Sequence, residues 1–239
     1  MTAIQTFNLF SPLDLAALFW LVLAILWIGW RIESPPRGQP SVSILMMGFR
    51  REWMRNMISR EPRVFDAQLI GNLRQGTAFF ASASMIAIGG TLALMGNTEQ
   101  LAGLVTDLTH GNAPAIVWEV KVLLVVALLA NAFLKFVWSH RLFGYCAVLM
   151  ASVPNDPDDP CTYPRAEQAA DVNITAARSY NRAMRSVYFA LASVAWLLGP
   201  VALMVAVVVT TAVLYRREFA SESRASLLRV PSEARPPAT

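Results

Sequence analysis

The sequence has little charge for its length of 239 residues. Only 15% of the residues are charged and 55% are hydrophobic, and the mean hydropathy is +0.44. This balance is too apolar for a soluble domain of this size. The scarcity of charge therefore argues against a soluble globular protein and predicts a membrane protein.

Lysine is almost absent, since Lys121 and Lys135 are the only two in the chain. Arginine supplies nearly all of the positive charge, and the arginines gather at the ends of apolar runs rather than on a polar domain. This distribution suits lipid phosphates and argues against a nucleic-acid partner. The expected partners are membrane lipids, in particular anionic headgroups at the cytoplasmic face.

Cysteine and histidine are equally scarce, which argues against most metal and cofactor sites. Cys146 and Cys161 are too far apart for a metal motif, and both are expected on the reducing cytoplasmic side. His110 and His140 are predicted on opposite sides of the membrane, which argues against a haem held by two histidines. The sequence has no G-x-x-x-x-G-K-[ST], G-x-S-x-G or H-E-x-x-H motif. We expect no metal, no cofactor and no enzymatic activity.

Four apolar stretches are long enough to cross a bilayer, which takes about 20 residues. They cover residues 13–30, 76–96, 116–137 and 186–215, and Pro200 is expected to kink the last one. The prolines and aspartates of residues 154–164 separate two longer helical patterns. The predicted fold class is all-α: an integral membrane four-helix bundle with a cytoplasmic extension of helices three and four.

The arginines also predict the direction of insertion. The first connection carries eight arginines, whereas residues 97–115 carry neither lysine nor arginine. The first and third connections are therefore expected in the cytoplasm of a bacterial cell, with the protein in the inner membrane and its N-terminus outside. Four spans also predict an outside C-terminus, although Arg216 and Arg217 favour the opposite side. The membrane domain would comprise residues 1–219, followed by a disordered tail over residues 220–239.

The first connection contains a predicted amphipathic helix. Its apolar residues recur every three or four positions, at Val42, Met46, Phe49, Trp53 and Met57. Arg51 and Arg55 fall on the opposite face. Such a helix can lie in the cytoplasmic interface as a sensor of lipid or of a partner, or it can be a connector docked on its own bundle.

Asp66 follows this helix and is expected to meet Arg63 or Arg74 at the membrane boundary. A carboxylate among arginines in this position is predicted to form a structural ion pair. The alternative is a gate or an ion-binding carboxylate.

Two polar stripes are predicted on the third and fourth helices. One face of the third helix carries Asn131, Lys135, Trp138, Arg141 and Tyr145. One face of the fourth carries Arg178, Asn181, Arg182, Arg185, Tyr188 and Trp196. Two basic stripes can adjoin at the headgroup level, across water or around a shared anion. They therefore predict a membrane-surface anchor, an anion or solute site between the helices, or a partner contact.

Three segments together resemble a bacterial and plant family of multi-pass membrane proteins, described only as a domain of unknown function. They read REPRVFDAQLIGNLRQGTAFFASASMIAIGGTLALMG, WEVKVLLVVALLANAFLKFVWSHRLFGY and AARSYNRAMRSVYFALASVAWLLGP. The resemblance covers roughly residues 11–218. It implies motif positions at Asp66, Lys121, Lys135, Trp138, Arg141, Tyr145, Asn181, Arg185, Tyr188 and Trp196. It implies no reaction, and this chain has Gly144 where family members favour asparagine.

The leading functional prediction is a non-enzymatic accessory or scaffold subunit that binds lipid or a larger membrane complex, or that assembles with itself. The alternative is a small channel or transporter for an anion or another solute, with a basic cytoplasmic mouth around Lys135, Arg141 and Arg185. The candidate site residues are Asp66, Asn131, Lys135, Trp138, Arg141, Tyr145, Asn181, Arg185, Tyr188 and Trp196.

Overall fold

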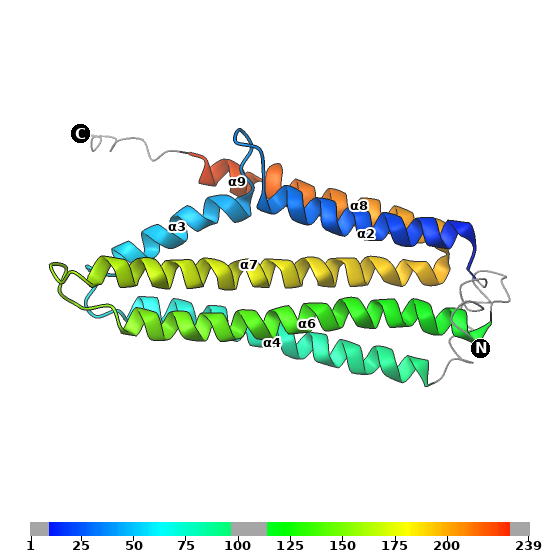
Figure 1. The fold of residues 1–239 in the computed structure, drawn as a ribbon, viewed down its shortest axis with the longest axis horizontal. Coiled ribbons are helices and arrows are strands. Elements are labelled where there is room, and N and C mark those ends of the chain that lie inside the picture. The colour runs from blue at the N-terminus through cyan, green and yellow to red at the C-terminus, as the bar shows by residue number, and fades with distance from the viewer. Residues whose placement is uncertain (1–9, 97–113, 230–239) are drawn as a thin grey trace, which may run out of the picture.

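The computed structural model describes residues 10–96 and 114–229, and the fold is all-α across these two ranges (Figure 1). Its helices are α2 (Pro12–Glu33), α3 (Val42–Asn56), α4 (Val64–Met95), α6 (Ala115–Ala151), α7 (Thr162–Val194), η1 (Ala195–Leu198), α8 (Pro200–Phe219) and α9 (Glu222–Leu227). Four of them, α2, α4, α6 and α8, are long and apolar enough to cross a membrane. The predicted fold class is confirmed. His110 and most of the second connection lie outside the described residues.

Side chains fix where α2 and α3 begin. The Ser11 hydroxyl accepts from the backbone N–H of Asp14, while the Asp14 carboxylate accepts from Ser11, which makes a capping box. Ser41 caps α3 by accepting from the backbone N–H of Ile44, and its hydroxyl also donates to the carbonyl of Ile32 at 2.8 Å. Ser41 therefore ties the start of α3 to the end of α2.

The predicted fourth span, residues 186–215, is divided between helices that run in opposite directions. α7 ends at Val194, η1 adds one turn, and Gly199 then adopts a φ of +129°, which side chains with a Cβ rarely tolerate. Pro200 opens α8, because proline needs no hydrogen-bonded N–H in the first turn. The expected kink at Pro200 is therefore a reversal, and α8 runs back beside α2 (Figure 1).

This reversal changes the predicted side of the C-terminus. α2, α6 and α8 all begin at the same end of the molecule, so α7 must return the chain across the bundle (Figure 1). Ser43 donates to Glu218 through its N–H at 3.0 Å and its hydroxyl at 2.9 Å, and Arg224 Nε donates to the Pro40 carbonyl at 2.9 Å. The start of the tail thus lies beside the first connection, and the prediction of an outside tail opposite that connection is wrong.

The predicted disorder of the tail is also corrected in part. Ser221 caps α9 by accepting from the backbone N–H of Arg224, so residues 222–227 are helical. Residues 230–239 lie outside the described residues.

We expect Ser34→Cys and Ser223→Cys to be labelled from the same side of the membrane, because the first connection and the tail touch. The measurement is labelling with a membrane-impermeant maleimide in sealed, oriented vesicles of a Cys161→Ser background. Ala115→Cys, at the opposite end of the bundle, is the matched control and should be labelled from the other side. Labelling of Ser223→Cys together with Ala115→Cys would contradict the arrangement of α7 and α8.

α6 and α7 form the antiparallel hairpin that extends beyond the ends of α2 and α8 (Figure 1). Small buried residues, among them Ala169 and Ala176, allow α7 to approach α6 closely. At the level of Phe136 in α6, the centroid of the Phe136 ring lies 5.6 Å from that of Phe80 in α4 and 5.5 Å from that of Tyr180 in α7. The predicted extension of the third and fourth helices is therefore present.

α3 docks on the projecting part of α7. Arg51 pairs with Asp171 at 2.9 Å, and Arg55 pairs with Glu167 at 2.7 Å, so both arginines face acidic side chains of the same chain. Met54, outside the predicted apolar stripe, is fully buried, whereas Phe49 within that stripe is exposed. The docked connector is the interpretation that these contacts favour.

Candidate functional site

A cavity of about 240 Å³ lies between α3 and α7, where the ends of α2 and α8 meet them. Glu33 is the last residue of α2 and Glu218 is the next to last of α8, so this α3–α7 cavity lies where two apolar helices end. Its polar lining consists of Glu33, Ser43, Arg50, Arg178, Asn181, Arg185 and Glu218. Three arginines therefore face two glutamates, and apolar side chains of α3 and α7 complete the walls.

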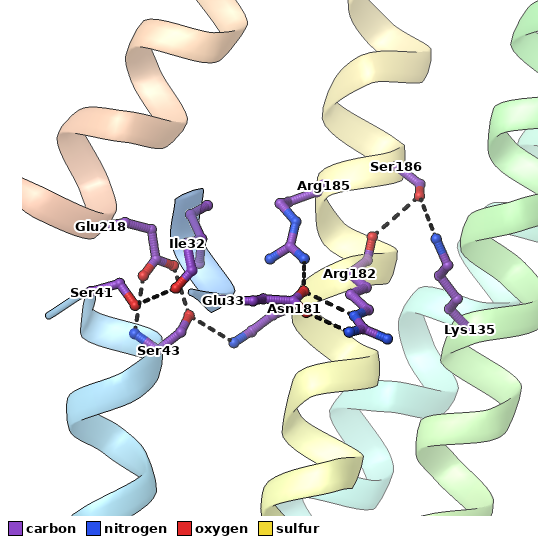
Figure 2. Close-up of polar contacts among 10 residues, drawn as sticks. All are labelled: Ile32, Glu33, Ser41, Ser43, Lys135, Asn181, Arg182, Arg185, Ser186 and Glu218. Carbon is purple, nitrogen blue, oxygen red and sulfur yellow. Dashed lines mark hydrogen bonds and ion pairs between the residues drawn. The ribbon is translucent and has the colours of Figure 1, made fainter. Parts of the chain in front are cut away.

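Glu33 provides the anion that the basic side chains share. Its carboxylate accepts from Arg182 Nε at 2.9 Å and forms ion pairs with both Arg182 and Arg185 (Figure 2). Arg185 is largely buried, with 12% of its side chain exposed. Glu33 was absent from the residues that sequence reasoning selected. The available signal was an acidic residue at the end of an apolar run, just before two prolines.

Glu218 closes the cavity from the side of α8. Its carboxylate accepts hydrogen bonds from the N–H and the hydroxyl of Ser43. Asn181 Nδ2 in turn donates to the Ser43 hydroxyl at 3.3 Å (Figure 2). Ser43 lies in the first turn of α3, so the helix dipole there favours the negative charge of Glu218. Within residues 10–96 and 114–229, Glu218 has no ion-pair partner.

The other two arginines of the cavity differ in their surroundings. Arg50 donates to the Asn173 side chain, and burial lowers the pKa of its guanidinium, although arginine keeps its charge in proteins. Arg178 is exposed and forms no ion pair with the described part of the chain. The cavity therefore presents positive charge beyond that neutralised by Glu33.

Asn131 and Lys135 lie at the contact between α6 and α7 rather than in the α3–α7 cavity. Asn131 Nδ2 donates to the Ser186 hydroxyl at 2.9 Å. Lys135 Nζ lies 3.5 Å from the same oxygen (Figure 2). Ser186 also donates to the carbonyl of Arg182. The structure thus brings these two predicted site residues together, in a polar contact between helices.

The remaining residues of the α6 stripe do not face α7. Trp138 and Tyr145 are about half exposed, and Arg141 donates to the Tyr145 hydroxyl at 3.0 Å on the same flank. The buried face of α6 instead carries Phe136 and Ser139, beside the predicted stripe. The two predicted stripes therefore do not adjoin at Trp138, Arg141 and Tyr145.

Asp66 is buried and forms a separate ion pair. It is 1% exposed, accepts from Trp53 Nε1 at 2.7 Å and pairs with Arg60, not with the expected Arg63 or Arg74. Arg63 donates instead to the backbone carbonyls of residues 153 and 154, at 2.8 and 2.9 Å. The structure places Asp66 at the corner between α3 and α4, away from the α3–α7 cavity.

Tyr188 and Trp196 also lie outside the cavity. The Tyr188 hydroxyl accepts from Arg217 of α8. Trp196 is buried in η1, beyond the end of α7, where its indole N–H donates to Asp14 at 2.8 Å. Lys121 lies between two indoles there, with Nζ 4.7 Å from the Trp118 ring centroid and 5.6 Å from that of Trp196. Of the ten candidate site residues, Asn181 and Arg185 line the α3–α7 cavity, together with Arg178 of the predicted α7 stripe.

These features define a helical membrane protein with a charged cavity at the ends of its apolar helices. Residues 16–223 match the model of a family described as "Protein of unknown function, DUF599", and the chain belongs to that family. The resemblance inferred from the three segments is confirmed. No curated protein and no solved structure matches the chain.

Proposed function

We propose that the chain is a non-enzymatic membrane protein that holds the phosphate group of a membrane lipid in the α3–α7 cavity. The supporting observation is the excess of arginine over glutamate in a cavity at the ends of α2 and α8. A lipid phosphate lies at this depth when the helices span the bilayer. The proposed role of the protein is that of an accessory or scaffold subunit in a larger membrane assembly.

The chemistry of the lining supports phosphate in preference to a neutral ligand. A guanidinium can donate two parallel hydrogen bonds to phosphate oxygens, and such charge-assisted bonds are stronger than neutral ones. Arg178 forms no ion pair with the described residues that would have to break first. Val42, Met46 and Ile174 offer apolar surface beside the arginines. An amphiphile therefore matches the cavity better than a free ion does.

We expect Arg178→Gln to weaken the binding of a short-chain phospholipid by on the order of tenfold, the size of one charge-assisted hydrogen bond. The full chain, delipidated in detergent, is titrated with the lipid and binding is followed by native mass spectrometry. Arg141→Gln is the matched control, since Arg141 is exposed on α6 and its side chain contacts Tyr145. Its lipid affinity should stay unchanged.

Three other results would redirect the proposal. Inorganic phosphate that binds as tightly as the lipid would keep the phosphate chemistry and reject the lipid source. Equal loss of binding in both variants would reject the cavity. Anion flux in reconstituted vesicles, reduced by Lys135→Gln with Arg185→Gln, would favour a channel or transporter. The accessory role itself is tested by co-purification with a larger assembly after mild detergent extraction.

A further inference from the structure

We infer that the α3–α7 cavity selects a headgroup with a primary amine beside its phosphate, as in phosphoethanolamine lipids, and that Glu218 makes this selection. The inference rests on the proposed function, because it names the class of lipid that the same cavity would take. The two carboxylates in the lining differ in their partners. Glu33 meets two guanidinium groups, whereas Glu218 accepts hydrogen bonds from Ser43.

The charges of the cavity lie on different walls. Glu218 and Ser43 stand on the side formed by α8 and α3, and Arg185 stands on α7 across the gap, with Glu33 and Asn181 between them (Figure 2). Arg178 belongs to the same wall as Arg185, since both are residues of α7. Arg50 comes from α3, but its guanidinium donates to Asn173 of α7. The guanidinium groups of the cavity therefore gather along α7, across from Glu218 on the α8 side.

A ligand with a phosphate and a nearby ammonium group complements both walls. The phosphate can accept from Arg178, while the ammonium can donate to Glu218, whose oxygens have acceptor capacity beyond the two bonds from Ser43. A phosphoglycerol headgroup offers only neutral hydroxyls at the place of the ammonium, so it forms no ion pair with Glu218. The amine-bearing headgroup is thus favoured by one added charge-assisted attraction.

Glu218 also has a structural role, because it accepts hydrogen bonds from the first turn of α3. Capping needs a hydrogen-bond acceptor, and the side-chain oxygen of glutamine can still accept from the Ser43 N–H. Glu218→Gln therefore removes the charge and keeps an acceptor. Loss of the cap alone would change the melting temperature and leave the preference between headgroups as it was.

The test compares two short-chain lipids with the same acyl chains, one with a phosphoethanolamine and one with a phosphoglycerol headgroup. We expect the delipidated full chain to bind the phosphoethanolamine lipid about tenfold more tightly, the scale of one charge-assisted hydrogen bond. Glu218→Gln should reduce that ratio to near one. Glu222→Gln is the control, since Glu222 is an exposed residue of α9 outside the cavity lining, and it should keep the tenfold ratio.

The outcomes separate this inference from the proposed function. Equal binding of both lipids by the unaltered chain, lost in Arg178→Gln, would overturn the amine selection and keep the phosphate site. A tenfold preference that persists in Glu218→Gln would assign Glu218 to capping only and would also overturn the inference. Failure of the unaltered chain to bind either lipid would overturn the proposed function itself.

Discussion

Asp66→Ala is expected to lower the free energy of unfolding by about 3 kcal/mol, the lower end of the range for breaking a buried ion pair. Asp66 is 1% exposed, and its carboxylate receives the Trp53 indole of α3 and the Arg60 guanidinium at the corner before α4. Removing it leaves both donors without this acceptor. The lower end applies because 37% of the Arg60 side chain is exposed, so water can solvate its guanidinium once the carboxylate is removed.

Thermal or urea unfolding of the purified protein in detergent measures this effect. Asp66→Asn keeps an oxygen for the indole N–H and should cost less than Asp66→Ala, since a neutral hydrogen bond contributes about 1 kcal/mol. Asp158→Ala is the matched control, because Asp158 is exposed in the loop between α6 and α7. If Asp66→Ala were no more costly than this control, the alternative of a gating or ion-binding carboxylate would gain support.

The choice of partner for Asp66 shows where sequence reasoning ends. Three arginines, Arg60, Arg63 and Arg74, lie within a few helical turns of it, and spacing alone permits a pair with each. The corner between α3 and α4 brings Arg60 to the carboxylate, while Arg63 is held by backbone carbonyls about 90 residues later in the chain. Local periodicity predicts that an ion pair forms, whereas the packed fold decides which pair.

The fold likewise has elements that the local sequence predicts and one that depends on contacts distant in sequence. Apolar length and the proline-rich loop are local properties, so α2, the apolar part of α4, α6 and the projecting hairpin follow from them. The reversal at Gly199 rests on one positive φ inside a long apolar run. The sequence shows a glycine followed by proline there, which fits a kink and a reversal equally. Packing of α8 beside α2 distinguishes the two, and it depends on contacts distant in sequence.

The helical pattern predicted the polar cavity residues of α7, but it did not predict the polar residues of α2, α3 and α8 that complete the cavity. The face of α7 with Asn181 and Arg185 does line a cavity, as its helical spacing suggested. The opposite walls come from α2, α3 and α8 rather than from α6. Glu33 and Arg182 are separated by 149 residues, so no local pattern links them. A carboxylate at the end of the first apolar run was the only signal that pointed to this partner.

Glu33→Gln is expected to destabilise the unliganded protein by about 2 kcal/mol, within the range for hydrogen bonds to charged groups. Glu33 is 23% exposed and Arg185 12%, so neither charge is well solvated once the pair is broken. Glu167→Gln is the matched control, because its pair with Arg55 is more than half exposed on both sides. Exposed pairs contribute about 0.2–1 kcal/mol, so this control should lose less. Unfolding in detergent compares the two variants.

The same substitution should strengthen phosphate binding while it weakens the fold. Glu33 competes with any ligand for Arg185, so its neutralisation leaves that guanidinium free to donate to a phosphate in the α3–α7 cavity. We expect the affinity for the phosphoethanolamine lipid to rise several-fold in Glu33→Gln, and to stay unchanged in Glu167→Gln. A variant that loses stability and lipid affinity together would show that Glu33 builds the cavity instead of competing for its arginine.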